Sequence, residues 1–338
     1  MGKAQLIENL HHERFVLRQL QQHDQHQDFL SEVRAGLGAT PKTLSPKFFY
    51  DEEGSRLFER ITEQTEYYPT RKEAEILDAF GGEIIDTTRH GQDFTLVELG
   101  SGSSTKTRLL LNELAERQDA ISYVPIDISP TIVTEFAERL LQDYPALHIT
   151  GLICDYHQAM TELKSHPEDN KLFLFLGSSL GNFTPADASA LLSDIAAAMG
   201  PQDKLLLGLD LIKDEVVLNR AYNDAAGVTA AFNLNLLTRI NRELGGEFDL
   251  ARFRHKAFFN AGQRRVEMHL ESLAEQTVRV DALDAAFSFA AGETIHTENS
   301  YKFDRAALGE LLAGTGLRLV QQWRDGDDWF SLNLVARS

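Results

Sequence analysis

The stretch VELGSGSSTKT (residues 97–107) decides the fold, because an apolar run passes directly into glycines, hydroxyl groups and a Lys-Thr pair. Such a turn between a strand and a helix can cradle a nucleoside triphosphate, a dinucleotide or a smaller nucleoside. A P-loop requires glycine directly before Lys-Thr, and Thr105 occupies that position. A dinucleotide fingerprint requires a third glycine after Gly100 and Gly102, and Thr105 again replaces it. The stretch therefore argues against both a P-loop and a nicotinamide-dependent oxidoreductase.

Outward from this stretch, short apolar runs alternate with helical patterns. Pro130 begins a helix that is expected to run to about residue 141. Thr184 and Pro185 are typical of the N-cap and first position of a helix that extends to residue 199. Near-continuously apolar segments, as buried parallel strands require, lie at 94–100, 121–129, 148–156, 171–179 and 204–211. This alternation predicts an open, parallel α/β sheet.

The pattern changes after residue 211, where two helical segments and then an antiparallel patch of strands are predicted. A helix at 305–312 and two closing strands, 317–323 and 329–337, complete a seven-stranded sheet with an antiparallel last strand. About ninety residues thus interrupt the sheet domain. The predicted division is a polar N-terminal arm and helix at 1–43, a second, α+β domain at 44–71 plus 213–302, and the sheet domain at 72–212 plus 303–338.

The composition argues against several classes of function. The 338 residues include 51 acidic and 33 basic side chains, a net charge of −18. Because an acidic surface repels phosphate backbones, no nucleic-acid partner is expected. Cys154 is the only cysteine, which excludes an intrachain disulfide and a cysteine-based zinc site.

The N-terminus lacks the apolar core of a signal peptide, and MGKAQL has Leu6 where a myristoylation motif has Ser or Thr. We therefore expect a cytoplasmic, monomeric protein without a membrane partner. The N-terminal segment is rich in glutamine and histidine, but no acidic or cysteine ligand set accompanies its histidines. A solvated or helical arm is favoured over a metal site, and no metal site is predicted. The histidines concerned are His11, His12, His23 and His26.

Acidic residues follow the next two predicted strands where a bound nucleoside would need them. Asp127 ends the second strand and can hold ribose hydroxyls. Asp155, after the third strand, can accept the adenine amino group, with Tyr156 beside the ring. Gly177, after the fourth strand, completes a crevice at the carboxyl ends of the strands. With Gly100, this set resembles class I S-adenosylmethionine-dependent methyltransferases. The structural alternative is that the two aspartates only cap the following helices.

Longer stretches outside the glycine turn carry a more specific resemblance. They are LSPKFFYDEEGSRLFERITEQTEYYPTRKEAEIL (44–77), FLGSSLGNFTP (175–185), RAYNDAAGVTAAFN (220–233), VEMHLES (266–272) and HTENSYKF (296–303). These stretches resemble the histidine-specific Nα-methyltransferases of ergothioneine biosynthesis, over roughly residue 44 to the C-terminus. The resemblance implies trimethylation of the α-amino group of L-histidine to hercynine, with S-adenosylmethionine as cofactor. It also implies a Rossmann-like methyltransferase domain and a substrate domain built from the N-terminal segment and the late insertion.

The resemblance also implies roles for single residues. Tyr67 and Tyr222 would hold the substrate carboxylate. Asn182 would accept a hydrogen bond from the α-amine, and Tyr50 would line the amine pocket. The residues that would contact the cofactor are Gly100, Lys106, Asp127, Asp155, Tyr156 and Gly177.

Glu298 and Ser300 would bind the imidazole by the same resemblance, with Met268 packing beside it. The chain departs from the family where Asn299 replaces an apolar residue next to this site, and where Tyr156 replaces phenylalanine. Each substrate residue has a structural alternative. These are a turn anchor for Tyr67 and Asn182, helix surface for Tyr222, core packing for Met268 and a solvated position for Glu298.

These residue types suit methylation of an amine. The amine must arrive neutral and in line with the methyl group, so positioning supplies most of the catalysis. A quaternary ammonium product has no N–H left to donate, and aromatic faces stabilise it by cation–π attraction. Glu298 would discriminate against apolar side chains. Two competing hypotheses are methylation of another amino acid or small amine, and a non-enzymatic cofactor-binding protein, which would have no use for an amine pocket.

Overall fold

The computed structural model describes residues 5–6, 13–20, 25–89, 92–102, 105–165 and 170–338. These residues form two compact units. The first unit contains the described residues up to 20, together with Pro69–Leu211 and Phe303–Ser338. The second contains the described residues from 25 to Tyr68, together with Ile212–Lys302. The second unit is therefore inserted into the sequence of the first.

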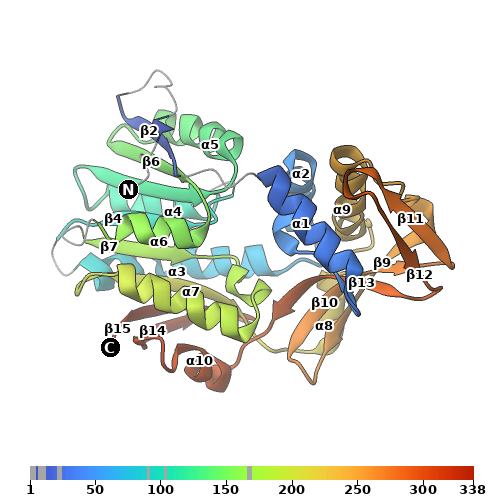
Figure 1. The fold of residues 1–338 in the computed structure, drawn as a ribbon. Helices are drawn as coiled ribbons and strands as arrows, with labels where there is room; N and C mark the ends of the chain where they lie inside the picture. Colours follow the sequence, from blue (N-terminus) through green and yellow to red (C-terminus); the bar gives the residue numbers. More distant parts are fainter. Residues whose placement is uncertain (1–4, 7–12, 21–24, 90–91, 103–104, 166–169) are drawn as a thin grey trace. The chain divides into compact units, whose positions relative to one another are not determined.

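Nine strands form the sheet of the first unit, in the order β1-β2-β6-β5-β4-β7-β8-β15-β14 (Figure 1). The strands from β2 to β8 in this order run parallel, and β15 pairs antiparallel with β8 and β14. The predicted five parallel strands and closing hairpin are confirmed, and the fold is Rossmann-like. The strands are β1 (Gln5–Leu6), β2 (Phe15–Gln19), β4 (Thr95–Leu99), β5 (Ile121–Asp127), β6 (Leu147–Ile153), β7 (Lys171–Phe175), β8 (Lys204–Asp210), β14 (Leu317–Arg324) and β15 (Phe330–Arg337).

The N-terminal segment differs from the prediction of a separate arm beside a seven-stranded sheet. Strand β2 pairs with β6, so that the sheet gains two strands. Phe15 and Leu17 are buried, because alternate residues of β2 face the core. Arg14 fixes this edge, since its guanidinium donates to four backbone carbonyl groups between Leu141 and Leu147 at 3.0–3.1 Å. The predicted arm histidines His11, His12 and His23 lie outside the described residues, and His26 is exposed.

Helices pack in pairs beside this sheet (Figure 1). Helix α3 packs on α4, and α7 packs on both α6 and α10. Ser129 and Thr184 cap α5 and α7 with their hydroxyl groups, and a proline occupies the first helical position of each. The helices are α3 (Pro69–Arg89), α4 (Thr107–Ala115), α5 (Pro130–Asp143), α6 (Tyr156–Leu163), α7 (Pro185–Ala198) and α10 (Arg305–Leu312). Among the described residues, none of the helices is long and apolar enough to cross a membrane.

The second unit combines helices with a four-stranded sheet in the order β3-β13-β10-β9 and a two-stranded hairpin, β11-β12. The antiparallel patch predicted here is confirmed, since β10 pairs antiparallel with both β9 and β13. The strands are β3 (Lys42–Thr43), β9 (Phe253–Asn260), β10 (Arg265–Ser272), β11 (Gln276–Val280), β12 (Ala285–Phe289) and β13 (Thr294–Tyr301). The helices are α1 (Gln25–Gly38), α2 (Glu52–Thr62), α8 (Glu215–Ala221) and α9 (Val228–Leu244).

A β-bulge at Thr297 sets which side chains of β13 share a face. Glu298 lies opposite Met268, whereas His296 lies opposite His269, so that Thr297 is the extra residue. The Thr297 hydroxyl donates to the Met268 carbonyl at 3.0 Å and to the Asn233 amide oxygen at 2.8 Å. Because opposed residues project from the same face, Glu298 and Met268 share the buried face and the two histidines share the other.

Candidate functional site

The glycine turn after β4 has a backbone that only glycine adopts easily. Gly100 and Gly102 have φ values of +71° and +48°. A Cβ on Gly100 would lie 2.7 Å from the Tyr156 hydroxyl, so this position excludes a side chain twice over. The Tyr156 ring packs edge-on against Phe175 at 5.5 Å, and burial raises the pKa of its phenol. The Tyr156 side chain therefore lies against the glycine turn. The sequence predicts that it contacts the cofactor. Ser103 and Ser104 lie outside the described residues.

Glu98, within residues 97–107, is a buried carboxylate that stabilises this turn. Glu98 is the fourth residue of β4 and accepts hydrogen bonds from the Thr107 hydroxyl, 2.8 Å from each carboxylate oxygen, and from the Tyr123 phenol. Burial raises the pKa of Glu98 to about 7. The carboxyl group thus ties the first residue of α4 to strands β4 and β5. Glu98 was not predicted as a site residue, although an acid within an apolar run is the available signal.

A second buried carboxylate, Glu73 of α3, joins two of the predicted cofactor residues. It forms an ion pair with Lys106 and accepts the Gly177 N–H, 2.9 Å from both carboxylate oxygens. Space for it comes from Gly208 in β8, where a Cβ would lie 2.1 Å from Glu73 Oε1. Glu73 therefore fixes the turns that follow β4 and β7 relative to each other. Glu73 was not predicted as a site residue, because a charged residue in a helical pattern is ordinarily solvated.

The two predicted aspartates differ in their surroundings. Asp127 ends β5 and accepts the Ser129 N–H at 3.0 Å, while Ser129 itself caps α5. Burial raises the pKa of Asp127, and backbone N–H groups, including that of Gly102, act against this rise. Asp155 is exposed and is the N-cap of α6, in a capping box with Gln158. Asp155 thus caps a helix, whereas Ser129 and not Asp127 is the N-cap of α5.

Asn182 also belongs to the first unit. It is the last residue of the 3₁₀ turn η2 (Ser179–Asn182), which follows β7 and Gly177. Ser178 precedes this turn in the left-handed region, at φ +57°, and its hydroxyl accepts the Asp210 N–H at 2.9 Å. Asn182 is half-buried at the carboxyl end of the parallel strands, at the edge of the sheet where ligands of this fold class bind.

In the second unit, an aromatic cluster brings three predicted substrate residues together. The Tyr67 ring lies 6.4 Å from that of Tyr222 and 6.3 Å from that of Phe58, edge-on in both pairs. Tyr50 packs edge-on against Phe58 at 5.7 Å and against Phe232 at 5.8 Å. Phe58 and Phe232 were not identified from the sequence, since apolar residues at helical spacing are usually core.

The polar end of this cluster is organised by a buried lysine that sequence analysis missed. Lys302 is 2% exposed, and its ammonium donates to the Ser300 hydroxyl at 2.7 Å and to the Tyr222 hydroxyl at 3.0 Å. The Tyr222 hydroxyl in turn donates to Ser300 at 2.6 Å. Tyr222 is 7% exposed, so it is not a helix-surface residue. A lysine in the polar run HTENSYKF gives no sequence signal of burial.

Glu298 and Met268 lie opposite each other on the buried face of β13 and β10, on the same face as Ser300. Both are buried, which excludes the solvated position considered for Glu298. Burial raises the pKa of Glu298 to about 7, and the positive charge of Lys302 opposes that rise. The second unit therefore holds one acidic and one basic group, two hydroxyls and an aromatic wall. Such a set can bind a zwitterion with a hydrogen-bonding side chain.

Nearly the whole chain aligns with known proteins of one family. The family model described as "Histidine-specific methyltransferase, SAM-dependent" matches residues 29–337. A histidine N-alpha-methyltransferase of Mycobacterium tuberculosis is 44% identical over 306 residues, which cover 90% of this chain and 94% of that protein. Another, from Mycolicibacterium smegmatis, is 45% identical with the same coverage. Ergothioneine biosynthesis protein 1 of Neurospora crassa is 32% identical over 88% of this chain, which spans 33% of that longer protein.

The buried position of the Glu73 carboxylate beside Gly208 is tested by Gly208→Ala. The new Cβ would meet the carboxylate and displace it, so we expect a loss of about 1–3 kcal/mol in the free energy of unfolding. The matched control is Gly309→Ala in α10, where nothing lies within 4 Å of the added Cβ and stability should be equal or higher. Urea unfolding of both variants makes the comparison. Wild-type stability in Gly208→Ala would mean that Glu73 does not occupy this position.

Proposed function

The chain belongs to the family of histidine-specific, S-adenosylmethionine-dependent methyltransferases, and we propose that it trimethylates the α-amino group of L-histidine to give hercynine, the first step of ergothioneine biosynthesis. The observation that carries this proposal is the 44% identity over 94% of a histidine N-alpha-methyltransferase. The second unit supports it, because buried polar residues form a site next to the aromatic cluster. They are Glu298, Ser300, Tyr222 and Lys302.

The carboxyl edge of the first unit's sheet fits S-adenosylmethionine. Gly100 gives the turn its positive φ and lets the Tyr156 hydroxyl approach it, and the Gly102 N–H of the same turn bonds to the Asp127 carboxylate. We assign Asp127 to the ribose hydroxyls of S-adenosylmethionine, and Asp155 and Tyr156 to its adenine. The turns at Gly100 and Gly177 would contact the rest of the cofactor. Lys106 would bind the carboxylate of the amino-acid portion. The bound cofactor supplies a methyl group activated on a sulfonium centre.

The second unit would hold the amino acid. Tyr67 would donate to its carboxylate, and Tyr222 would do so by turning its hydroxyl proton away from Ser300. The Lys302 ammonium next to Tyr222 adds a positive charge that favours an anion there. Glu298 and Ser300 would pair with the imidazole nitrogens, with Met268 against the ring. Carboxyl and hydroxyl groups suit imidazole because its two nitrogens are one donor and one acceptor in the neutral form.

The reaction that this arrangement serves is a direct displacement, repeated three times. The lone pair of the neutral α-amine would form an N–C bond with the methyl group that the cofactor supplies, while the C–S bond would break and leave its electron pair on sulfur. Asn182 would accept an N–H hydrogen bond and aim the lone pair in the first two transfers, and a proton would leave to water before each next transfer. After the third transfer no N–H remains. The aromatic rings around Tyr50 then suit the trimethylammonium group through cation–π attraction, worth about 0.5–2 kcal/mol.

The function is tested by incubating the purified chain with S-adenosylmethionine and each of the twenty amino acids, followed by mass spectrometry with fragmentation. We expect three methyl groups on the α-nitrogen of L-histidine and little turnover of the other nineteen. Methyl groups on the imidazole nitrogens, or a product that stops at one methyl, would contradict the proposal.

The cofactor role of Asp127 is tested by Asp127→Ala. A carboxylate that holds two ribose hydroxyls makes hydrogen bonds worth about 1.5–3 kcal/mol each, so affinity for S-adenosylmethionine should fall at least about tenfold. Calorimetric titration measures this, and the exposed Asp119→Ala is the matched control. A loss well below tenfold, with the fold intact, would remove Asp127 from the cofactor site.

The substrate role of the buried lysine is tested by Lys302→Met, which keeps an unbranched chain and removes the ammonium. We expect KM for L-histidine to rise about tenfold or more, because charge-assisted hydrogen bonds are lost, while affinity for S-adenosylmethionine is unchanged. Lys256→Met, at an exposed position of β9 in the same sheet, is the control. An unchanged KM in a folded Lys302→Met protein would show that this ammonium does not contribute to substrate binding.

A further inference from the structure

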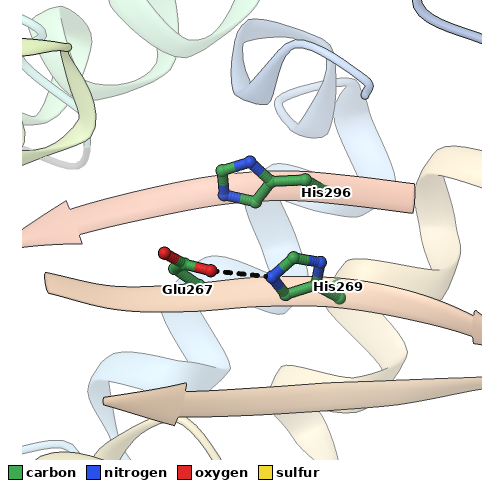
Figure 2. Close-up of side chains that lie close together, drawn as sticks. All are labelled: Glu267, His269 and His296. Carbon is green, nitrogen blue, oxygen red and sulfur yellow. Dashed lines mark hydrogen bonds and ion pairs between the residues drawn. The ribbon is translucent and has the colours of Figure 1, made fainter. Parts of the chain in front are cut away.

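Two histidines and a glutamate meet on the face of β10 and β13 opposite Met268 and Glu298. They are Glu267, His269 and His296, and Figure 2 shows their side chains gathered over the two strands. We propose that this cluster is a binding site for a divalent transition-metal cation, with Zn²⁺ the ion that its donor set fits. Two imidazoles and one carboxylate are a usual ligand set for zinc, with a water molecule in the fourth position. The proposal is independent of the methyltransferase function.

The three ligand groups are already close together. One ligand atom from each residue lies within 4.8 Å of the others, and His269 Nε2 is 3.1 Å from Glu267 Oε2. The His269 ring is stacked between its neighbours in the sheet, with the His296 ring at 4.7 Å and the Phe258 ring at 5.5 Å. The side chains of Glu267 and His269 are only 9% and 13% exposed. Packing therefore holds the imidazoles in place before any ion binds.

Neighbouring groups orient the carboxylate as they do in metal sites. Glu267 Oε1 accepts from Asn260 at 2.9 Å and from Arg265 at 2.8 Å, which leaves Oε2 directed at His269. Hydrogen bonds of this kind to a ligating carboxylate are a regular part of metal centres.

Metal binding also has costs, and these set the affinity. The ion would replace the proton that His269 Nε2 shares with Glu267, so the ring proton moves to Nδ1, which is buried without a partner among the described residues. Coordination through His296 Nε2 would break its 3.1 Å hydrogen bond with the Glu298 carbonyl. The Arg265 guanidinium also repels a cation. We therefore expect micromolar affinity, weaker than that of four-ligand structural zinc sites.

The position of the cluster gives an ion a structural effect. Glu267 and His269 flank Met268 in β10, and His296 precedes the bulge that sets Glu298. An ion held by both strands would clamp β10 to β13 at this bulge, directly behind the face assigned to the substrate. The sequence gives no hint of the site, because the bulge, and not a short spacing motif, brings His296 to His269.

The test uses the full chain without an affinity tag, freed of metal with a chelator, and titrated with ZnCl₂ by calorimetry and thermal unfolding. We expect about one equivalent to bind and Tm to rise by roughly 5–10 °C at a hundredfold excess over Kd. MgCl₂ should give no shift, because Mg²⁺ prefers oxygen ligands. With Co²⁺, visible absorption typical of nitrogen and oxygen ligands should appear.

The deciding variants are His269→Phe and His296→Phe, which keep an aromatic ring in the stack and remove the ligand atom. Each should abolish the zinc-induced rise in Tm, whereas the exposed His148→Ala should behave as the wild type. Tm in the presence of chelator shows whether each variant folds. Glu267→Gln offers a second measurement with nearly the same shape, and should weaken zinc binding at least tenfold. Zinc binding that persists in His269→Phe would place the ion elsewhere, for example on the N-terminal histidines, and would overturn the proposal, as would a wild type that binds no zinc.

Discussion

The first unit depends on the buried carboxylate of Glu73. A charge in a protein interior is tolerated only when it is paired and hydrogen-bonded, and Glu73 has both the Lys106 ammonium and the Gly177 N–H. Its partners come from two loops that are more than seventy residues apart in sequence. Gly208 provides the space, since any side chain there would occupy the position of the carboxylate. The shape of the proposed cofactor edge is thus fixed by Glu73 and Gly208, which do not need to touch the cofactor.

In the second unit, the bulge at Thr297 has a comparable effect. Without the extra residue, Glu298 would lie on the same face as His296, because side chains two apart in a strand point the same way. The bulge separates them and puts Glu298 beside Ser300 and Met268. One irregularity therefore creates both the buried acidic group of the proposed substrate site and the imidazole pair on the opposite face.

Sequence patterns predicted the elements that are recognisable from their own residues and missed those that are recognisable only from distant partners. The parallel strands were found because each is a continuous apolar run, although β7 ends at Phe175, earlier than expected, where the glycine turn begins. Strand β2 was missed because five residues in a polar arm become a strand only by pairing with β6. Glu73 and Lys302 were missed for a similar reason. In a sequence, a buried charge cannot be told from a solvated one until its partners are known.

The charge pattern of the second unit explains why histidine would be favoured there. The chain carries a net charge of −18, yet its proposed substrate site contains a buried lysine beside the Tyr222 hydroxyl, which would meet a carboxylate. In β13, four residues before Lys302, Glu298 is buried opposite Met268, where a side-chain N–H would meet it. An apolar amino acid would pair its carboxylate with the group at Lys302 and Tyr222, but its side chain would leave Glu298 without a partner. This would cost about 1–3 kcal/mol or more. Selection for histidine would then come from the penalty on other side chains as much as from attraction.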